Sequence, residues 1–227
     1  MKSILLPLNV EGSETQVKID HVYCIGYAGR SLEKTMEHII ELEKIGIPRP
    51  EEVPTLYPVR RNSLNQSGEI QVLGNESSGE AEIVLVFGDS EDEVYITVGS
   101  DHTDRSLETV DINKSKQICD KPLAQKAWNL KDVVNHWDDL ILTSQVMVND
   151  EWVDYQRAKI NEIIPLNEIK DFLSKKGAAM KNSVVFSGTV PLLDGFKYGT
   201  GFKMSFIDET RNSEIHAEYA ISRLEME

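Results

Sequence analysis

The chain has 227 residues, 40% of them hydrophobic and 27% charged, so it is long and apolar enough to bury a core. Its 24 Lys and Arg against 38 Asp and Glu give a formal net charge of −14, which argues against binding to phosphate backbones, and we expect no nucleic-acid partner. No apolar run suits a membrane span or a secretory signal, and two cysteines are too few for a disulfide framework, so we expect a cytoplasmic protein without a membrane partner.

The first part of the chain predicts a strand, a helix and an extended segment. Residues 16–25 are β-rich and predict a strand. Apolar residues at helical spacing after Ser31 predict a helix over residues 31–46, with Ser31 as its N-cap and Gly46 at its end. Repeated prolines then force an extended conformation over residues 48–58.

The middle of the chain predicts β structure. Residues 70–73 predict a short strand. Residues 80–87 and 93–99 are β-rich runs on either side of an acidic turn at residues 88–92, and this pattern is typical of a hairpin.

The rest of the chain predicts both element types. Apolar residues at helical spacing predict a second helix over residues 130–141, with Trp137 packed in the core. A further hairpin is expected from residues 146–148 and 152–155, followed by a helix over 166–173. Later strands are predicted at residues 184–186, 202–207 and 214–221. Because no linker or repeat divides the chain, the sequence predicts one mixed α/β domain in which strands predominate.

The most informative local pattern is the pair Glu80 and Glu82 at the start of the strand over residues 80–87. Carboxylates at positions i and i+2 of a strand point to the same face, with Cα atoms ~6.6 Å apart. The hairpin places Glu82 opposite Gly99 and Glu80 opposite Asp101, so the three carboxylates are expected on one face.

Three like charges at such separations repel one another unless a cation or shared protons neutralise them. Oxygen ligands with no nearby cysteine suit Mg²⁺, or alternatively Mn²⁺ or Ca²⁺, better than zinc. A second interpretation stays open at this point, in which Glu80 and Glu82 only solvate an edge strand.

Other motifs surround this cluster in a defined order. An upstream His-x-x-Glu pair follows a glycine turn, Asp101 begins an Asp-x-x-x-Arg segment, a lysine precedes a Pro-containing loop, and a Gly-Thr pair lies downstream. The residues that carry these motifs are His38 and Glu41, Arg105, Lys116, and Gly188 with Thr189. Together with the Glu-x-Glu pair they resemble the fumarylacetoacetate hydrolase-like superfamily over roughly residues 22 to 191.

The resemblance implies a fumarylacetoacetate hydrolase-like β-rich roll with peripheral helices, and a homodimer. It divides the single catalytic domain, residues 1–227, into an N-terminal strand, lid helix and extended segment over 1–60 and a metal-binding core over 61–227. It also implies a metal-dependent hydrolase that cleaves a C–C bond in a small 2,4-dioxo acid of the acylpyruvate or fumarylacetoacetate type. By resemblance, the metal ligands are Glu80, Glu82 and Asp101, the catalytic residues are His38, Glu41 and Lys116, and the substrate-binding residues are Arg105, Glu108 and Thr189.

Several alternatives stay open. His38 next to Glu41 on a helix forms a general base with an orienting carboxylate, or else is an ordinary surface histidine. Glu108 stands where the family often carries Gln, and it either pairs with Arg105 or contacts substrate. Decarboxylation, hydration or tautomerisation of a 2-oxo acid uses the same site, and so does a metabolite-binding module without turnover.

Three departures from the family pattern are visible. The stretch between Glu82 and Asp101 is shorter than usual, an insertion after Gly29 places His38 farther along than expected, and Gly188-Thr189 lacks an immediate proline. These differences affect the expected substrate more than the expected metal.

Overall fold

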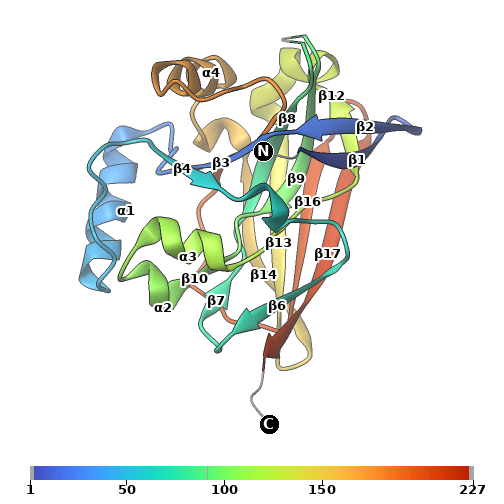
Figure 1. Ribbon diagram of the computed structural model, residues 1–227. Coiled ribbons are helices and arrows are strands. Elements are labelled where there is room, and N and C mark those ends of the chain that lie inside the picture. Colours follow the sequence, from blue (N-terminus) through green and yellow to red (C-terminus); the bar gives the residue numbers. More distant parts are fainter. Residues whose placement is uncertain (1–2, 91, 225–227) are drawn as a thin grey trace.

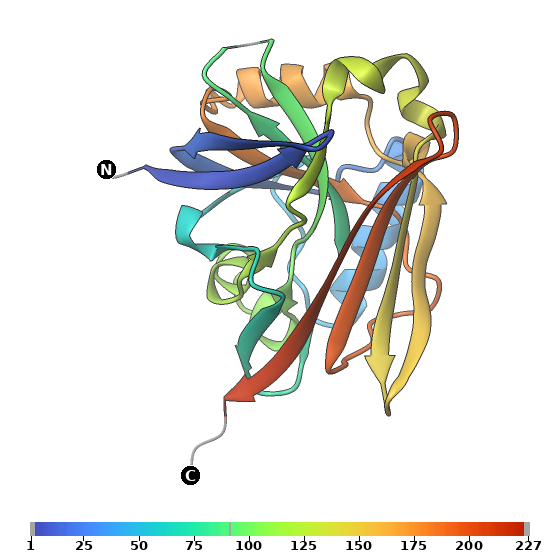
Figure 2. The same ribbon diagram turned by 90° about the vertical axis from the view of Figure 1, so that its right-hand side faces the viewer.

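Two β-sheets face each other in the computed structural model of this protein, which describes residues 3–90 and 92–224 (Figures 1 and 2). Within these residues the larger sheet has eight strands, in the order β2 (Ser13–Ile19), β1 (Ile4–Val10), β12 (Lys126–Asn129), β9 (Val94–Ser100), β8 (Ala81–Phe87), β15 (Ser183–Thr189), β3 (His21–Gly26) and β4 (Thr55–Val59). The smaller sheet, counted over the same residues, has five, in the order β14 (Glu151–Lys159), β13 (Ile141–Val148), β16 (Gly201–Asp208), β17 (Ser213–Leu224) and β6 (Glu69–Leu73).

Two short strand pairs lie at the edge of this framework and carry residues that matter below. They are β10 (Thr103–Asp104) with β7 (Ser77–Ser78), and β11 (Lys121–Pro122) with β5 (Leu64–Asn65).

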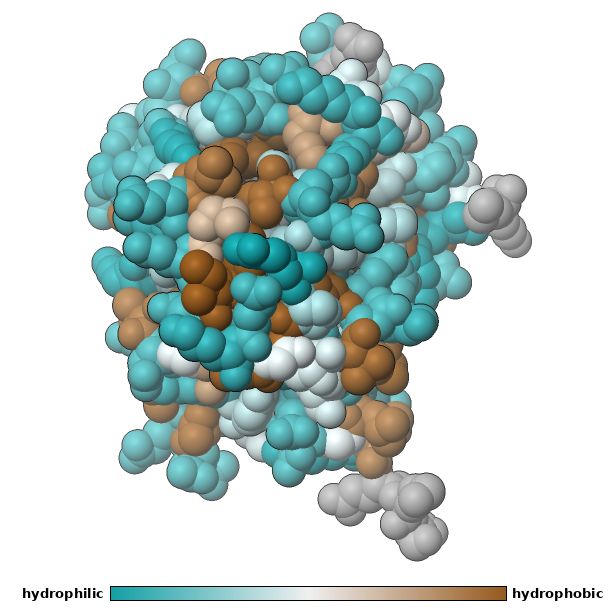
Figure 3. Space-filling model, turned by 90° about the vertical axis from the view of Figure 1, so that its left-hand side faces the viewer, coloured by the Kyte–Doolittle hydropathy of each residue, from teal (hydrophilic) through white to brown (hydrophobic). Residues whose placement is uncertain are grey.

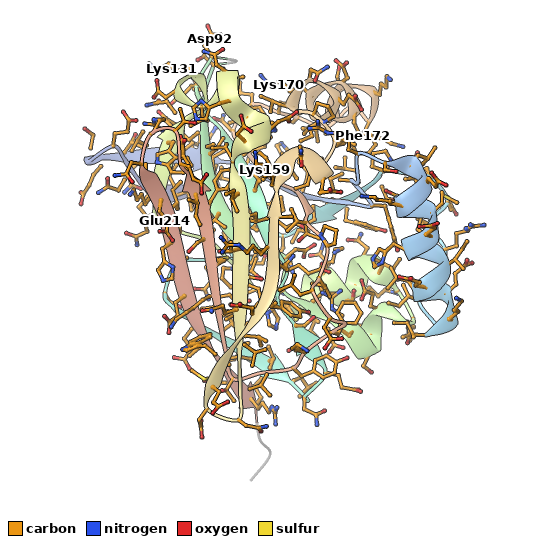
Figure 4. The ribbon with its side chains drawn as sticks, turned by 180° about the vertical axis from the view of Figure 1, so that it is seen from behind. Asp92, Lys131, Lys159, Lys170, Phe172 and Glu214 are labelled. Carbon is orange, nitrogen blue, oxygen red and sulfur yellow. The ribbon has the colours of Figure 1, made fainter. Side chains whose placement is uncertain are left out.

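The α-helices are α1 (Leu32–Lys44), α2 (Arg105–Glu108), α3 (Ile112–Ile118) and α4 (Leu166–Lys175), and α1, α2 and α3 lie on one side of the sheets (Figure 1). Short 3-10 segments are η1 (Arg61–Ser63), η2 (Leu130–Asp132), η3 (Val134–Asp139) and η4 (Ile160–Glu162). Seen from behind, Lys131 of η2 and Lys170 and Phe172 of α4 lie at the same end of the molecule (Figure 4). Among the described residues, no helix is both long and apolar enough to cross a bilayer.

The hydrophobic core lies in two layers on either side of the larger sheet. Alternate residues of β8, such as Ile83 and Leu85, pack against the smaller sheet, whereas Val84 and Val86 pack on the opposite face. A strand that is covered on both faces needs apolar residues at every position, which explains the uninterrupted apolar run after Glu82. Strand β16 of the smaller sheet alternates instead, because one face of that sheet is left less buried.

Several predicted elements are confirmed. Helix α1 begins after Ser31, whose side chain accepts a hydrogen bond from the Lys34 amide, and the chain takes a positive φ at Gly46 beyond its end. The β13–β14 hairpin turns at Asn149 and Asp150, which both have positive φ as a tight hairpin turn requires.

Two predicted elements are wrong. Residues 16–25 form parts of two strands, β2 and β3, because the chain bends at Asp20. Residues 130–141 do not form an α-helix but the segments η2 and η3, interrupted by a non-helical conformation at His136. Tertiary contacts account for this, since His136 Nε2 lies 2.9 Å from Asp208 Oδ2 while Trp137 is buried in the core as expected.

Candidate active site

The hairpin of β8 and β9 brings the predicted acidic residues to one face of the larger sheet. Glu82 pairs with Gly99, which confirms the predicted register, and the Asp101 amide donates a hydrogen bond of 3.0 Å to the Glu80 carbonyl. Glu82 shares its strand face with Val84, on the side of the sheet turned away from the smaller sheet.

Glu82 is a buried carboxyl group. Its Oε2 accepts a hydrogen bond of 3.0 Å from the Gly188 amide, so the loop after β15 approaches the start of β8. Burial raises the pKa of Glu82 well above its usual value, the negative charge of Asp101 adds to the rise, and Lys116 opposes it. A cation at this place would therefore stabilise the ionised form of Glu82.

Asp101 lies between two buried lysines. Its Oδ2 is 2.5 Å from Lys116 Nζ, and its Oδ1 is 3.3 Å from Lys121 Nζ. Burial alone would raise the pKa of Asp101, but the charges of Lys116 and Lys121 outweigh it and hold the pKa below its usual value. Asp101 is thus ionised, with a positive charge at each oxygen.

Arg105 links the acidic face to helix α2. Its Nε donates to Ser78 Oγ at 2.7 Å, its Nη1 donates to Glu108 Oε2 at 2.9 Å, and its Nη2 lies 3.3 Å from Glu80 Oε1. The Phe196 ring stacks on the guanidinium group at 4.3 Å. Glu108 therefore pairs with Arg105 in this structure, which is one of the two roles left open by the sequence.

Thr189 ends β15 and is held by a buried glutamine. The Thr189 hydroxyl donates to the Ala81 carbonyl at 2.7 Å and accepts from Gln156 Nε2 at 2.6 Å. Gln156 Nε2 also donates to the Val190 carbonyl, and its Oε1 accepts from the Ala81 amide and from Ser144 Oγ. Gln156 thereby fixes the end of β15 against the start of β8.

His38 and Glu41 lie one helical turn apart on α1. His38 Nδ1 is 3.8 Å from Glu41 Oε2, an ion-pair distance that is too long for a hydrogen bond, and the side chains are 57% and 72% exposed. No hydrogen bond or ion pair among the described residues joins either of them to Glu80, Glu82 or Asp101. On the side of the molecule seen in Figure 3, hydrophobic residues lie among hydrophilic ones. Leu32 and Ile40 of α1 are exposed hydrophobic residues.

The donor set of the acidic face fits a hard divalent cation. Within the residues that the structure describes, no three His, Cys, Asp or Glu side chains converge closely enough to hold a metal as they stand. Lys116 pairs with Asp101, and Arg105 pairs with Glu80. However, the three carboxylates share one face, and Glu82 is buried with a raised pKa that a cation would lower.

Three residues of this region are not predicted from the sequence as parts of the site. Lys121 is fully buried although Lys-Pro is typical of an exposed turn, and Tyr155 and Gln156 are both buried although they are consecutive in a strand. Strict alternation fails here because the register of the β13–β14 pair shifts between Ser144 and Gln145, which leaves Tyr155 as the extra, bulged residue of β14. The one signal that the sequence offers for Gln156 is that it is a polar residue at an inward-facing position of a β-rich run.

Residues 25–219 match the family model described as "Protein of unknown function (DUF2848)". The chain belongs to this family. No curated protein matches the sequence of this family member.

Solved structures share its fold. A fumarylpyruvate hydrolase from Pseudomonas aeruginosa, in complex with Mn²⁺ and pyruvate, superposes with a TM-score of 0.68 at 18% identity, covering 99% of this chain and 98% of that one. A 2-keto-3-deoxy-D-arabinonate dehydratase, complexed with magnesium and 2,5-dioxopentanoate, has a TM-score of 0.66 at 16% identity, covering 94% and 77%. The 4-oxalocrotonate decarboxylase from Pseudomonas putida G7, complexed with calcium and acetate, has a TM-score of 0.53 at 12% identity, covering 89% of this chain and 76% of that one. The chain thus has the fumarylacetoacetate hydrolase-like fold that the resemblance predicts.

Proposed function

We propose that this protein is an enzyme that uses a divalent cation to hydrolyse a C–C bond in a small 2,4-dioxo acid of the acylpyruvate or fumarylacetoacetate type. The observation that carries the proposal is the shared sheet face of Glu80, Glu82 and Asp101, with the positive groups of Lys116 and Arg105 beside it. The fold supports it, because proteins of similar fold have solved structures with Mn²⁺ and pyruvate, with magnesium and 2,5-dioxopentanoate, and with calcium and acetate.

In this proposal Glu80, Glu82 and Asp101 would hold Mg²⁺, or alternatively Mn²⁺ or Ca²⁺. The ion, when bound, would supply Lewis-acid polarisation of the substrate's carbonyl oxygens. Lys116 carries a buried positive charge at the same place, so its Nζ can stabilise negative charge that develops on a substrate oxygen.

His38 is the proposed general base. With Glu41 one helical turn further along, the imidazole can take a proton from water while the carboxylate orients the ring. Such a base typically contributes ~10² to 10⁴ in rate.

Arg105 and Thr189 are the proposed substrate-binding residues. Arg105 presents Nη2 toward the acidic face, where a substrate carboxylate can accept a hydrogen bond from it. Glu108 holds Nη1 and so orients the guanidinium group. The Thr189 hydroxyl points its proton at the Ala81 carbonyl, and it would have to turn to donate to a substrate.

A second candidate is decarboxylation, hydration or tautomerisation of a 2-oxo acid at the same site. The exposure of His38 favours decarboxylation and tautomerisation among these reactions, because neither needs an activated water and so neither needs this base at the acidic face. The third candidate is a module that binds a metabolite without turnover, and the first experiment distinguishes it from an enzyme.

The first experiment measures metal binding and turnover with the full chain. Wild-type protein is titrated with Mn²⁺ and Mg²⁺ in a calorimeter, and the absorbance of acetylpyruvate is followed with each ion. Binding together with loss of absorbance supports the hydrolase, binding of ion and acetylpyruvate without turnover supports the module, and no ion binding rejects the proposal.

The second experiment tests the base. Replacing His38 by Gln should abolish hydrolysis while leaving Mn²⁺ affinity unchanged, because the imidazole is not one of the proposed metal ligands. Turnover that survives this substitution would remove His38 and Glu41 from the mechanism and favour the second candidate. The proposed homodimer is checked independently by light scattering, which should give twice the mass of the chain.

A further inference from the structure

Lys121 is a fully buried cation in the short strand β11. Its Nζ donates to the carbonyl oxygens of His102 and Lys116, each at 2.6 Å, and lies 3.4 Å from the Cys119 carbonyl oxygen. The fourth neighbour is Asp101 Oδ1 at 3.3 Å. One ammonium group therefore has four oxygen neighbours.

This arrangement explains how the charge can be buried. An ammonium group taken out of water is costly unless it is paired with a charge and hydrogen-bonded. Lys121 has three protons and meets both conditions, with one carboxylate and three carbonyl oxygens around it.

The oxygens around Lys121 belong to segments that carry residues of the candidate site. The His102 carbonyl directly follows Asp101 at the end of β9, and the Lys116 carbonyl is the backbone of the lysine whose side chain contacts Asp101 Oδ2. Lys121 thus joins the end of β9 to α3. Its charge also acts on Asp101, since it lowers the pKa of that carboxyl together with Lys116.

Geometry assigns the two oxygens of Asp101 different roles. Oδ1 faces Lys121, which is bound to backbone carbonyls and cannot move without losing those hydrogen bonds. Oδ2 faces Lys116, whose Nζ has no hydrogen-bond partner other than Asp101 within the described residues. Asp101 Oδ2 is therefore the oxygen that is available to groups that enter the site.

We propose that Lys121 is a positioning residue of the active site, which holds Asp101 by Oδ1 and the backbone of Lys116 so that Oδ2 and the Lys116 ammonium group face the site. The inference rests on the proposed function for the roles of Asp101 and Lys116. A residue that orients a metal ligand in this way typically contributes 10- to 100-fold to metal affinity or activity.

The test compares two substitutions of Lys121 with a matched control. Lys121→Met removes the charge and the hydrogen bonds, and Lys121→Gln removes the charge but keeps two amide protons. The control is Lys126→Met, because Lys126 Nζ also donates to a backbone carbonyl, that of Glu214 at 2.6 Å, but lies outside the site. Each variant is assessed by Mn²⁺ calorimetry without substrate, by kcat and KM with the substrate of the wild type, and by thermal unfolding.

Both Lys121 variants should raise the Mn²⁺ dissociation constant at least tenfold and lower kcat, whereas Lys126→Met should match the wild type. If Lys121→Met does not fold, the comparison is made with Lys121→Gln alone. A folded Lys121 variant that binds Mn²⁺ as tightly as the wild type overturns the proposal.

Failure of the proposed function gives a different result. If the wild type binds no Mn²⁺, the metal role of Asp101 is wrong, and a crystal structure of the Gln variant then decides the positioning role. Separation of Asp101 Oδ2 from Lys116 Nζ, which are 2.5 Å apart in the wild type, supports that role, and an unchanged contact overturns it.

Discussion

Lys116 Nζ lies 2.5 Å from Asp101 Oδ2, where Lys116 belongs to α3 and Asp101 directly follows β9. Both side chains are buried, so water screens the pair far less than it screens a surface pair. Burial alone would lower the pKa of Lys116, but the charge of Asp101 raises it well above its usual value, so the pair is fully ionised.

Replacing Lys116 by Met should lower the free energy of unfolding by about 3 kcal/mol, because the buried carboxylate of Asp101 loses one of its two counter-charges. Urea denaturation at pH 7 measures this change. The matched control is Lys114→Met on the same helix, whose pair with Asp111 at 3.0 Å involves a lysine side chain that is 74% exposed and should be worth less than about 1 kcal/mol. Equal losses in the two variants would contradict a buried pair.

Replacing Gln156 by Leu should destabilise the protein by roughly 3 kcal/mol, because buried partners such as the Ala81 amide and the Val190 carbonyl lose a hydrogen bond. The variant should also raise KM for the proposed substrate, since Thr189 loses the group that orients it. Denaturation and steady-state kinetics measure the two effects. Gln145→Leu is the control, because its amide makes one exposed hydrogen bond, to Asp154 on the same hairpin, and its loss should be below about 0.5 kcal/mol.

Replacing Gly188 by Ala should be more harmful than replacing Gly177 by Ala, although both glycines have positive φ. Gly188 has a φ of +103°, and an added Cβ would lie 2.7 Å from the Ala28 Cβ, whereas Gly177 has a φ of +65° and open space around it. Backbone strain costs about 1 kcal/mol at Gly177, and the clash should bring the loss at Gly188 to roughly 3 kcal/mol. Thermal unfolding that shows equal losses would mean that the Gly188 loop is free to move away from Glu82.

Tyr155 should make stability sensitive to alkaline pH. Burial raises the pKa of Tyr155 to about 12, Arg105 opposes the rise and Glu80 adds to it. In the unfolded chain the pKa is ~10, so between pH 10 and 12 the unfolded state loses a proton that the folded state keeps. The contribution of Tyr155 is complete below pH 10 and is lost as pH rises toward 12, by up to about 1.4 kcal/mol per pH unit.

The Phe variant of Tyr155 tests this. Its stability should fall less steeply than that of the wild type between pH 10 and 12, as measured by urea denaturation across that range. At pH 7 it should be at least as stable as the wild type, because the Tyr155 hydroxyl is buried and has no hydrogen-bond partner among the described residues. Parallel pH profiles for the two proteins would show that Tyr155 keeps its ordinary pKa when folded.

The hairpin of β8 and β9 shows how far local sequence reasoning reaches. The apolar run, the acidic turn and the two-residue period of a strand were sufficient to place Glu82 opposite Gly99 and to put Glu80 and Asp101 on the same face. Helix α1 was likewise predictable, because its cap at Ser31 and its stop at Gly46 are local signals. In both cases the interactions that decide the structure lie between residues that are close in the sequence.

Only the tertiary structure decided the surroundings of those residues. Residues 130–141 have the spacing of an α-helix, yet His136 lies in a 3-10 segment and contacts Asp208 of β16. Packing against β16 outweighs the weak local preference for an α-helix. The burial of Lys121 depends on the His102 carbonyl, and that of Gln156 depends on the Ala81 amide and the Thr189 hydroxyl, which the fold brings in from elsewhere in the chain. A polar side chain is stable inside a protein only where such partners surround it, and no local pattern of residues records where they will be.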